Sequence, residues 1–351
     1  MHTANPWSKK RKEVKALLQP FANSTYATPI LLALVDIALF VGASTLVVFA
    51  SNSVAKVLAS FALGVAISRM FVLGHDAAHA SLTPSRVLNS WLGRILFLPS
   101  MTCFSLWIAG HNLGHHGFTG LRPHDIPWVP LSPTEYLARS RLQRLTYKMY
   151  RSWWGSGIYY GYEIWWRRQI FPAGKVRPTF IKDSWLVTIF MALQIAGYVF
   201  AAHHTGQSAP KLILLGIVLP FALWLYMAAI VFYVHHTHET ARWYEDEADW
   251  RDAQPNLAGT SGTQLPLRFD LLLHNALAHT AHHANAAIPC YQLGKAQRAL
   301  ERSFPAEVPI RKISVGRYLA ITRRCQLYEP RQHRWVTFSE LEGSAAVGIA
   351  G

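Results

Sequence analysis

The chain contains, at residues 54–79, the stretch VAKVLASFALGVAISRMFVLGHDAAH. Its apolar part, residues 54–74, is long enough to cross the ~30 Å hydrocarbon core of a membrane as a helix that rises ~1.5 Å per residue. His75 and His79 follow directly and, four residues apart, project from one face of a helix. The stretch therefore predicts a membrane helix that ends in a pair of side chains suited to binding a metal.

The composition of the whole chain agrees with a protein that lies in a membrane. Of 351 residues, 51% are hydrophobic and only 15% are charged, which excludes an ordinary soluble protein of this size. A further run, about 87–109, contains Arg94 in its middle, so we expect it to be re-entrant or interfacial rather than spanning. Three other runs pass the same length test as residues 54–74: about 30–50, 185–202 and 211–234.

The basic residues predict how these four spans are oriented. With four crossings, 31 of the 34 Lys and Arg residues lie on the same side as the N-terminus. Cytoplasmic loops of membrane proteins are enriched in Lys and Arg, so this side, with both termini and every histidine cluster named below, is predicted to be cytoplasmic. We expect a cytosolic N-terminal segment (1–28), one membrane domain (29–342) and a disordered tail (343–351).

Three more histidine clusters lie next to the apolar runs: His111/His115/His116, His235/His236/His238 and His279/His282/His283. On an α-helix His111 and His115 would align, His116 would point about 100° away, and the last cluster would form one patch. So many imidazoles exceed the four ligands of a zinc ion and favour two irons. The GxGxxG, P-loop and HExxH motifs are absent, so a nucleotide-binding protein and a zinc protease are disfavoured.

At these clusters the sequence resembles the membrane fatty acid desaturase family, in particular the bacterial acyl-lipid desaturases of the omega-6 (delta-12) type. The resemblance implies an all-α integral membrane protein of the bacterial inner membrane, with four transmembrane helices and a cytosolic helical cap that holds a histidine-ligated di-iron site. It rests on three histidine boxes and two further segments: GHDAAH (Gly74–His79), GHNLGHH (Gly110–His116), HNALAHTAHH (His274–His283), FYVHHTHE (Phe232–Glu239) and WVPLSPTEY (Trp128–Tyr136).

The resemblance also implies which residues bind the two irons, with a ninth ligand at the end of the fourth span. These residues are His75, His79, His111, His115, His116, His236, His279, His282 and His283. Metal-bound imidazoles usually donate their other ring N–H to a neighbouring acceptor, which fixes the tautomer. We expect such supporting residues among Asp76, Asp125, His238, Glu239, His274 and Asn275.

The activity that the resemblance implies is oxygen-dependent desaturation of a fatty acyl chain in the membrane, with O2 as co-substrate and a cis double bond as product. The chain shows no haem-binding or flavin-binding segment, so the electrons are expected from a separate ferredoxin or b-type cytochrome with its reductase. Between Tyr136 and Lys182 the chain mixes arginines with tryptophans, and this region lies between membrane runs. Its position favours a lipid surface over nucleic acid as the partner of these residues.

Two alternatives remain open at this stage. The same boxes serve lipid or carotenoid hydroxylases and ketolases, in which the activated oxygen enters the product. A metal-binding membrane protein without catalytic activity, such as a transporter, is the second alternative. Transport would place ligands within the spans, whereas these clusters lie at the ends of the spans.

Overall fold

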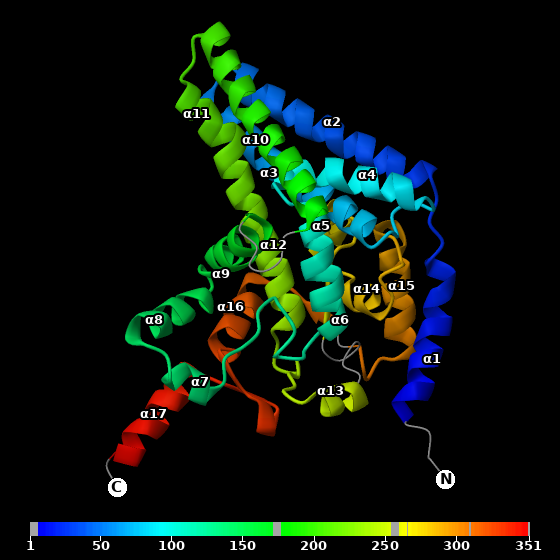
Figure 1. Cartoon of the computed structure of the whole chain (residues 1–351), viewed down its shortest axis with the longest axis vertical. Coiled ribbons are helices and arrows are strands. Elements are labelled where there is room, and N and C mark those ends of the chain that lie inside the picture. Colours follow the sequence, from blue (N-terminus) through cyan, green and yellow to red (C-terminus); the bar gives the residue numbers. More distant parts are fainter. Residues whose placement is uncertain (1–5, 171–176, 254–259, 265, 309, 350–351) are drawn as a thin grey trace.

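The computed structural model describes residues 6–170, 177–253, 260–264, 266–308 and 310–349, and these residues are mostly helical (Figure 1). Long helices extend toward the top of Figure 1, while shorter helices and both ends of the chain lie at the bottom. The molecule therefore has an elongated helical part and a cap at one end of it.

Four helical segments are long and apolar enough to cross a membrane: α2 (Ala27–Phe49), α3 (Ser53–Ala78), α10 (Pro178–Thr205) and the continuous segment Ala209–His236. The last comprises α11 (Ala209–Ile213), the π-helical η5 (Leu214–Val218) and α12 (Leu219–His236). Only 22% of the apolar window of α2 and 17% of that of α10 are buried, so these helices leave their apolar surfaces for lipid. The four membrane helices predicted from the sequence are confirmed.

The fifth apolar run forms two helical pieces that meet at an angle of 99°. Arg94 lies in the first piece, and its Nε donates to Oδ1 of Asp183 on α10 at 2.7 Å. The bend and this ion pair agree with a segment that turns back, but its position relative to the membrane stays a prediction. The pieces comprise α4 (Arg86–Phe97), η2 (Leu98–Ser100), α5 (Phe104–Trp107), the π-helical η3 (Ile108–His115) and α6 (His116–Phe118).

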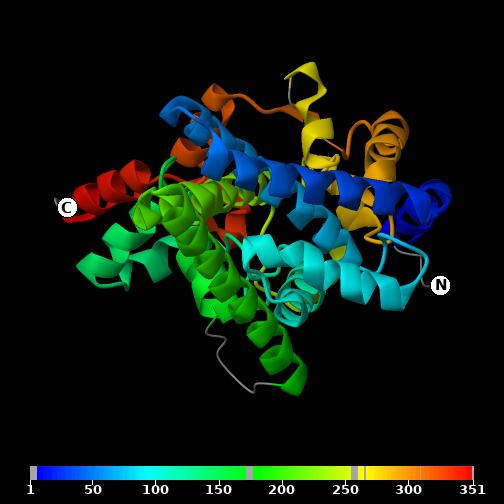
Figure 2. The ribbon, with the colours of Figure 1, turned by 90° about the horizontal axis from the view of Figure 1, so that it is seen from above.

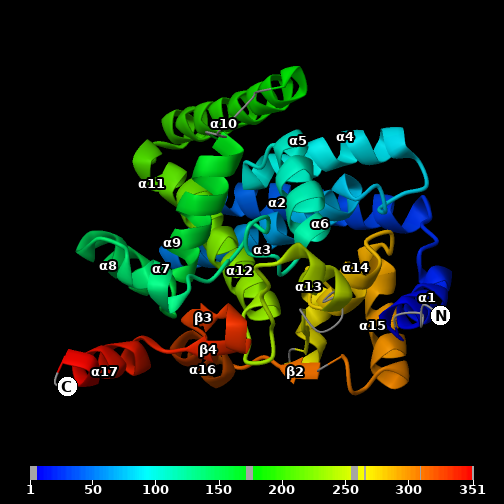
Figure 3. The same ribbon diagram turned by 60° about the horizontal axis from the view of Figure 1, so that its bottom comes forward.

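Short helices and small sheets lie at the lower ends of the long helices (Figure 3), and the view from above shows the first helix (blue) and the last helix (red) on opposite sides of the molecule (Figure 2). Among the described residues, β1 (Gly262–Gln264) pairs with β2 (Ile310–Lys312) in parallel, and β3 (Leu327–Glu329) pairs with β4 (Arg334–Val336) in antiparallel fashion. The helices of the cap are α1 (Pro6–Leu18), η1 (Gln19–Phe21), α7 (Pro133–Leu137), α8 (Arg141–Tyr150), α9 (Ser156–Tyr159), the π-helical η4 (Tyr160–Ile170), α13 (Glu247–Ala253), η6 (Pro266–Leu273), α14 (His279–Ala284), α15 (Cys290–Ser303), α16 (Val315–Arg324), η7 (Pro330–Gln332) and α17 (Phe338–Ile349).

At the C-terminal end, the backbone of α17 continues to Ile349. The expected disorder of residues 343–351 stays a prediction.

Aromatic side chains fill the space where the long helices enter the cap. The ring of Phe71 on α3 lies 5.2 Å from Phe97, 5.0 Å from Trp107 and 5.2 Å from Trp224, measured between ring centroids. Gly74 lets α4 approach closely, because a Cβ atom at this position would lie 2.5 Å from the Phe97 ring. This packing holds the end of α3, and with it the first histidine box, in a rigid surrounding.

Candidate metal centre

Nine histidines converge where the long helices meet the cap, and they form two groups. Within each group the ring nitrogens that could bind a metal lie within 4.8 Å of one another. The nine are the same residues that the resemblance implied as ligands. The first group contains His75, His79, His111, His116 and His282, and the second contains His115, His236, His279 and His283.

Each group draws on distant parts of the sequence. The first box lies at the C-terminal end of α3, the second box spans η3 and α6, and the third box forms α14. His236, the last residue of α12, joins the second group, whereas its neighbours His235 and His238 belong to neither group. Ligands from five elements, α3, η3, α6, α12 and α14, therefore converge although these elements lie far apart in the sequence.

The π-helical turn η3 changes the pairing that an α-helix would produce in the second box. The backbone N–H of His116 bonds to the carbonyl of His111, five residues back, and the Nε2 atoms of the two rings lie 3.2 Å apart. His111 therefore shares a group with His116 and not, as predicted, with His115. The predicted single patch in α14 is also split, because His279 and His283 lie in the second group and His282 in the first.

The ring nitrogens within the first group lie at hydrogen-bond distance from one another, but neutral rings cannot satisfy all of these contacts. Nε2 of His116 lies 3.2 Å from Nε2 of His111 and 3.0 Å from Nε2 of His282, and Nε2 of His75 lies 2.9 Å from Nε2 of His111. A neutral ring nitrogen either donates one proton or accepts, so such a network leaves lone pairs facing each other. A cation bound between them removes this conflict, and the residues present therefore fit a metal ion.

The second group shows the same feature. Nε2 of His236 lies 3.1 Å from Nε2 of His115 and 2.8 Å from Nε2 of His279. Two buried ring nitrogens, Nε2 of His79 in the first group and Nε2 of His283 in the second, have no hydrogen-bond partner. Buried polar atoms without a partner are rare in folded proteins, so both groups fit a bound ion.

Asp125 supports the second group. Its Oδ1 lies 2.7 Å from Nδ1 of His115 and accepts from the backbone N–H of Ile126 at 2.7 Å, while its Oδ2 accepts from the backbone N–H of Gly120 at 2.8 Å. The carboxylate can only accept, so Nδ1 of His115 carries the proton and Nε2 presents its lone pair to the group.

Thr119 acts in the same way on a different ring. Its hydroxyl donates to the carbonyl of His115 at 2.7 Å, and its oxygen lies 3.3 Å from Nδ1 of His283. Because the hydroxyl proton is already used, the oxygen accepts from Nδ1–H of His283 and leaves Nε2 free for a metal. The sequence reasoning missed Thr119, since only the fold brings this residue to a histidine so distant in the chain.

Asp76 connects the first box to α15, the helix that follows the third box. Its Oδ1 lies 3.2 Å from Nδ1 of His75, and its Oδ2 accepts from the backbone N–H of Cys290, the first residue of α15. A carboxylate is favourable at the N-terminus of a helix, so Asp76 both orients His75 and anchors the helix that follows the third box.

Two predicted supporting residues after the fourth span lie outside both groups. Glu239 accepts from Nη2 of Arg317 at 2.5 Å, and Nδ1 of His238 lies 3.0 Å from the hydroxyl oxygen of Thr240. The helix ends at His236, and the extended backbone at Thr237 directs the next side chains away. Neither residue belongs to a histidine group, and a role of Glu239 and His238 in supporting the ligands stays a prediction.

The two supporting residues predicted before α14 also contact other parts of the fold. Nε2 of His274 lies 2.6 Å from Oδ2 of Asp36 on α2, and Nδ2 of Asn275 donates to the carbonyl of Cys290 at 3.0 Å. Neither belongs to a histidine group, because the backbone turns at these residues before α14 begins.

The three histidines of α14 are buried. Burial, together with neighbouring imidazoles, holds the pKa of His279, His282 and His283 well below the usual value for histidine. These rings are therefore neutral near pH 7, which is the state in which an imidazole binds a metal.

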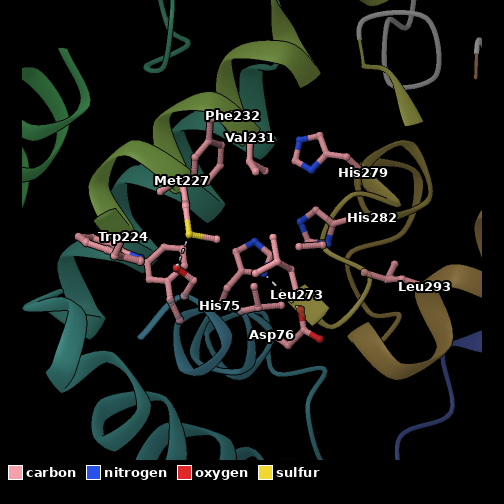
Figure 4. Close-up of a pocket in the computed structure, with 15 residues that line it drawn as sticks. His75, Asp76, Trp224, Met227, Val231, Phe232, Leu273, His279, His282 and Leu293 are labelled. Atoms are coloured by element: carbon pink, nitrogen blue, oxygen red, sulfur yellow. Dashed lines mark hydrogen bonds and ion pairs between the residues drawn. The ribbon is translucent and has the colours of Figure 1, made fainter. Parts of the chain in front are cut away.

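An apolar pocket ends at the histidines (Figure 4). The rings of His75, His279 and His282 lie at one side of it, and Trp224 and Met227 of α12 lie at the other. Ser68, Phe71, Val72, Val231, Phe232, Leu273 and Ala276 are among the other residues that line it. A long hydrocarbon chain fits such a surrounding better than a polar ligand does.

A second pocket also reaches the histidines. His111 and His115 line it together with Tyr160 and Gln169. Phe232 lines both pockets.

Comparison with known proteins agrees with this site. The model of the family described as fatty acid desaturase matches residues 51–314. An sn-1 oleoyl-lipid 12-desaturase from Synechocystis sp. is 29% identical over 281 residues, which cover 80% of this chain and 77% of that protein. One from Picosynechococcus sp. is 26% identical over 283 residues, covering 80% and 78%. A chloroplastic omega-6 fatty acid desaturase from Spinacia oleracea is 24% identical over 280 residues, covering 79% and 60%. The chain belongs to the fatty acid desaturase family.

Proposed function

We propose that this protein desaturates a fatty acyl chain of a membrane lipid with a pair of iron ions held by the nine histidines. As a member of its family the chain is an oxidoreductase that acts on fatty acyl groups. The observation that supports the proposal most strongly is the apolar pocket that ends at His75, His279 and His282. It combines a metal-binding surface with space for a hydrocarbon chain.

The donor set favours iron over other common metals. Nine imidazoles in two groups exceed what one zinc ion can take, and carboxylates are absent from both groups, which disfavours magnesium and calcium. Bound there, reduced iron would supply the activation of dioxygen that removal of hydrogen from an unactivated methylene requires. We propose O2 as the co-substrate for this reason.

The chain's own residues hold the acyl group and the ligands in place. Phe71, Trp224 and Met227 form an apolar wall that excludes water and aligns the hydrocarbon beside the histidines. Asp125 and Thr119 keep the proton on Nδ1 of His115 and His283, so that Nε2 of each ring stays available.

The relatives suggest the first substrate to test. Two proteins named sn-1 oleoyl-lipid 12-desaturase cover most of this chain, so we propose an oleoyl lipid as substrate and a cis double bond at carbon 12. We further propose that the cap faces the cytoplasm and receives electrons from a separate ferredoxin or b-type cytochrome. The net charge of +15 favours an acidic donor protein.

Expression in a bacterial host that contains oleoyl lipids but no diunsaturated ones tests the proposal. Gas chromatography with mass spectrometry of the fatty acids should show a product two hydrogens lighter than oleate. A product that is heavier by one oxygen would instead identify a hydroxylase. His279→Ala should abolish either product. If the wild-type protein binds about two irons per chain but leaves the lipids unchanged, it binds metal without catalysis.

A further inference from the structure

A buried network of charged side chains lies outside both histidine groups and joins α2, α3 and the segment before α14. Asp36 on α2 is completely buried. Its Oδ1 accepts from Nε of Arg69 on α3 at 2.6 Å, and its Oδ2 accepts from Nε2 of His274 at 2.6 Å. Nη1 of Arg69 also donates to the carbonyl of Leu272 at 2.7 Å. Charged residues in membrane helices are unfavourable unless paired, and their presence generally indicates a function.

The backbone at His274 is held in an unusual conformation. The N–H of Asn275 bonds to the carbonyl of Asp270 at 2.9 Å, and the N–H of His274 bonds to that of Leu271 at 3.2 Å. This pair of bonds defines a Schellman motif at the end of η6, in which glycine normally occupies the position of His274. Here His274 and Asn275 adopt φ values of +50° and +59°. The strained position is kept because only a side chain can reach Asp36.

The segment that this network holds forms part of the substrate pocket. Leu273 and Ala276, on either side of the strained turn, both line the pocket that ends at the histidines. In contrast, α14 has its own anchors, because the N–H of Ala281 donates to Oε1 of Gln297 at 2.9 Å and His283 contacts Thr119. The network therefore acts on the pocket wall more directly than on the metal ligands.

We infer that Asp36, Arg69 and His274 form a positioning network that fixes the wall formed by Leu273 and Ala276. This wall determines which carbons of the acyl chain lie beside His75, His279 and His282. The three residues thus influence where the double bond forms, although they touch neither substrate nor metal. The inference rests on the proposed desaturase function.

Three substitutions test the network, namely His274→Phe, Asp36→Asn and His274→Gln, and a fourth, Asp183→Asn, serves as a matched control. His274→Phe removes the donor at similar volume, and Asp36→Asn removes the charge. Asp183→Asn removes the charge from a comparable ion pair, Arg94 with Asp183, which joins α4 to α10, and neither residue lines the pocket. Each variant is purified as the full chain, and the fraction folded, iron per chain, kcat, KM and positions of the double bonds are measured with oleoyl phospholipid.

For His274→Phe and Asp36→Asn we expect a wild-type iron content, a kcat reduced by about 10- to 100-fold and double bonds spread over neighbouring positions. His274→Gln, which retains a donor, should recover most of the wild-type positions. Asp183→Asn should leave the positions unchanged. Wild-type double-bond positions and wild-type kcat in both His274→Phe and Asp36→Asn would overturn this inference but not the proposed function. Loss of folded protein in all three network variants, but not in the control, would also overturn it. Absence of any desaturated product from the wild type would overturn the proposed function first.

Discussion

Replacement of Asp125 by asparagine should weaken metal binding in the second histidine group. An amide has one acceptor oxygen, and that oxygen can serve His115 and the N–H of Ile126 as Oδ1 does now. The amide nitrogen then faces the N–H of Gly120, so a buried donor loses its acceptor, which costs about 1–3 kcal/mol of folding free energy. Loss of the charge beside His115 should reduce metal affinity 10- to 100-fold, or about 1.4–2.8 kcal/mol.

Chelator competition on purified, iron-loaded protein measures this effect. Asp125→Asn should release about one of two irons at a chelator concentration that leaves the wild type fully loaded. Glu239→Gln is the matched control, because this carboxylate also follows a histidine cluster but pairs with Arg317 at a partly exposed position, where such a pair contributes at most about 1 kcal/mol. Equal release of iron from Asp125→Asn and from the wild type would refute the assigned role of Asp125.

Three further outcomes are expected. Thr119→Val should lower iron affinity less than Asp125→Asn does, because it removes only a neutral acceptor from His283, and unchanged chelator titration would contradict this role. Gly74→Ala should lower the melting temperature, since the added Cβ meets the Phe97 ring and overpacking costs about 1–3 kcal/mol. Gly42→Ala is the control and should leave the melting temperature unchanged, because its Cβ would meet no atom within 4 Å. The metal-free protein should unfold more readily as the pH falls below about 6.5. In the unfolded chain the histidines take up protons, whereas in the folded protein the histidines of α14, whose pKa values are lowered by burial, do not. Greater stability at pH 5 than at pH 8 in chemical unfolding would contradict this.

The membrane helices and the position of the histidine clusters beside them could be predicted from local features of the sequence, whereas the set of nine converging histidines came from the resemblance to a known family. A span needs only a sufficient apolar length, as in residues 54–74, and the boxes lie directly at the ends of such runs. Four crossings place all histidine clusters on one side of the membrane, and the apolar runs that give this number are independent of the histidines. That this side is cytoplasmic follows from counting Lys and Arg and stays a prediction.

The division of the histidines between two groups could not be predicted in this way. The pairing of His111 with His116 depends on the π-helical turn η3, and a single sequence carries no clear signal for π-helices, which are rare. The supporting contacts of Asp36 with His274, and of Thr119 with His283, join residues far apart in the chain. Glu239 was assigned to the site because it is close in sequence, but the chain turns away after His236.

The most direct test of the account is Mössbauer spectroscopy of the protein loaded with 57Fe, combined with measurement of iron per chain. Two histidine groups, one of five rings and one of four, predict about two irons per chain in two distinct environments of nitrogen ligands. A single iron, or a chain that binds one zinc ion and excludes iron, would contradict the central claim that each group holds its own metal.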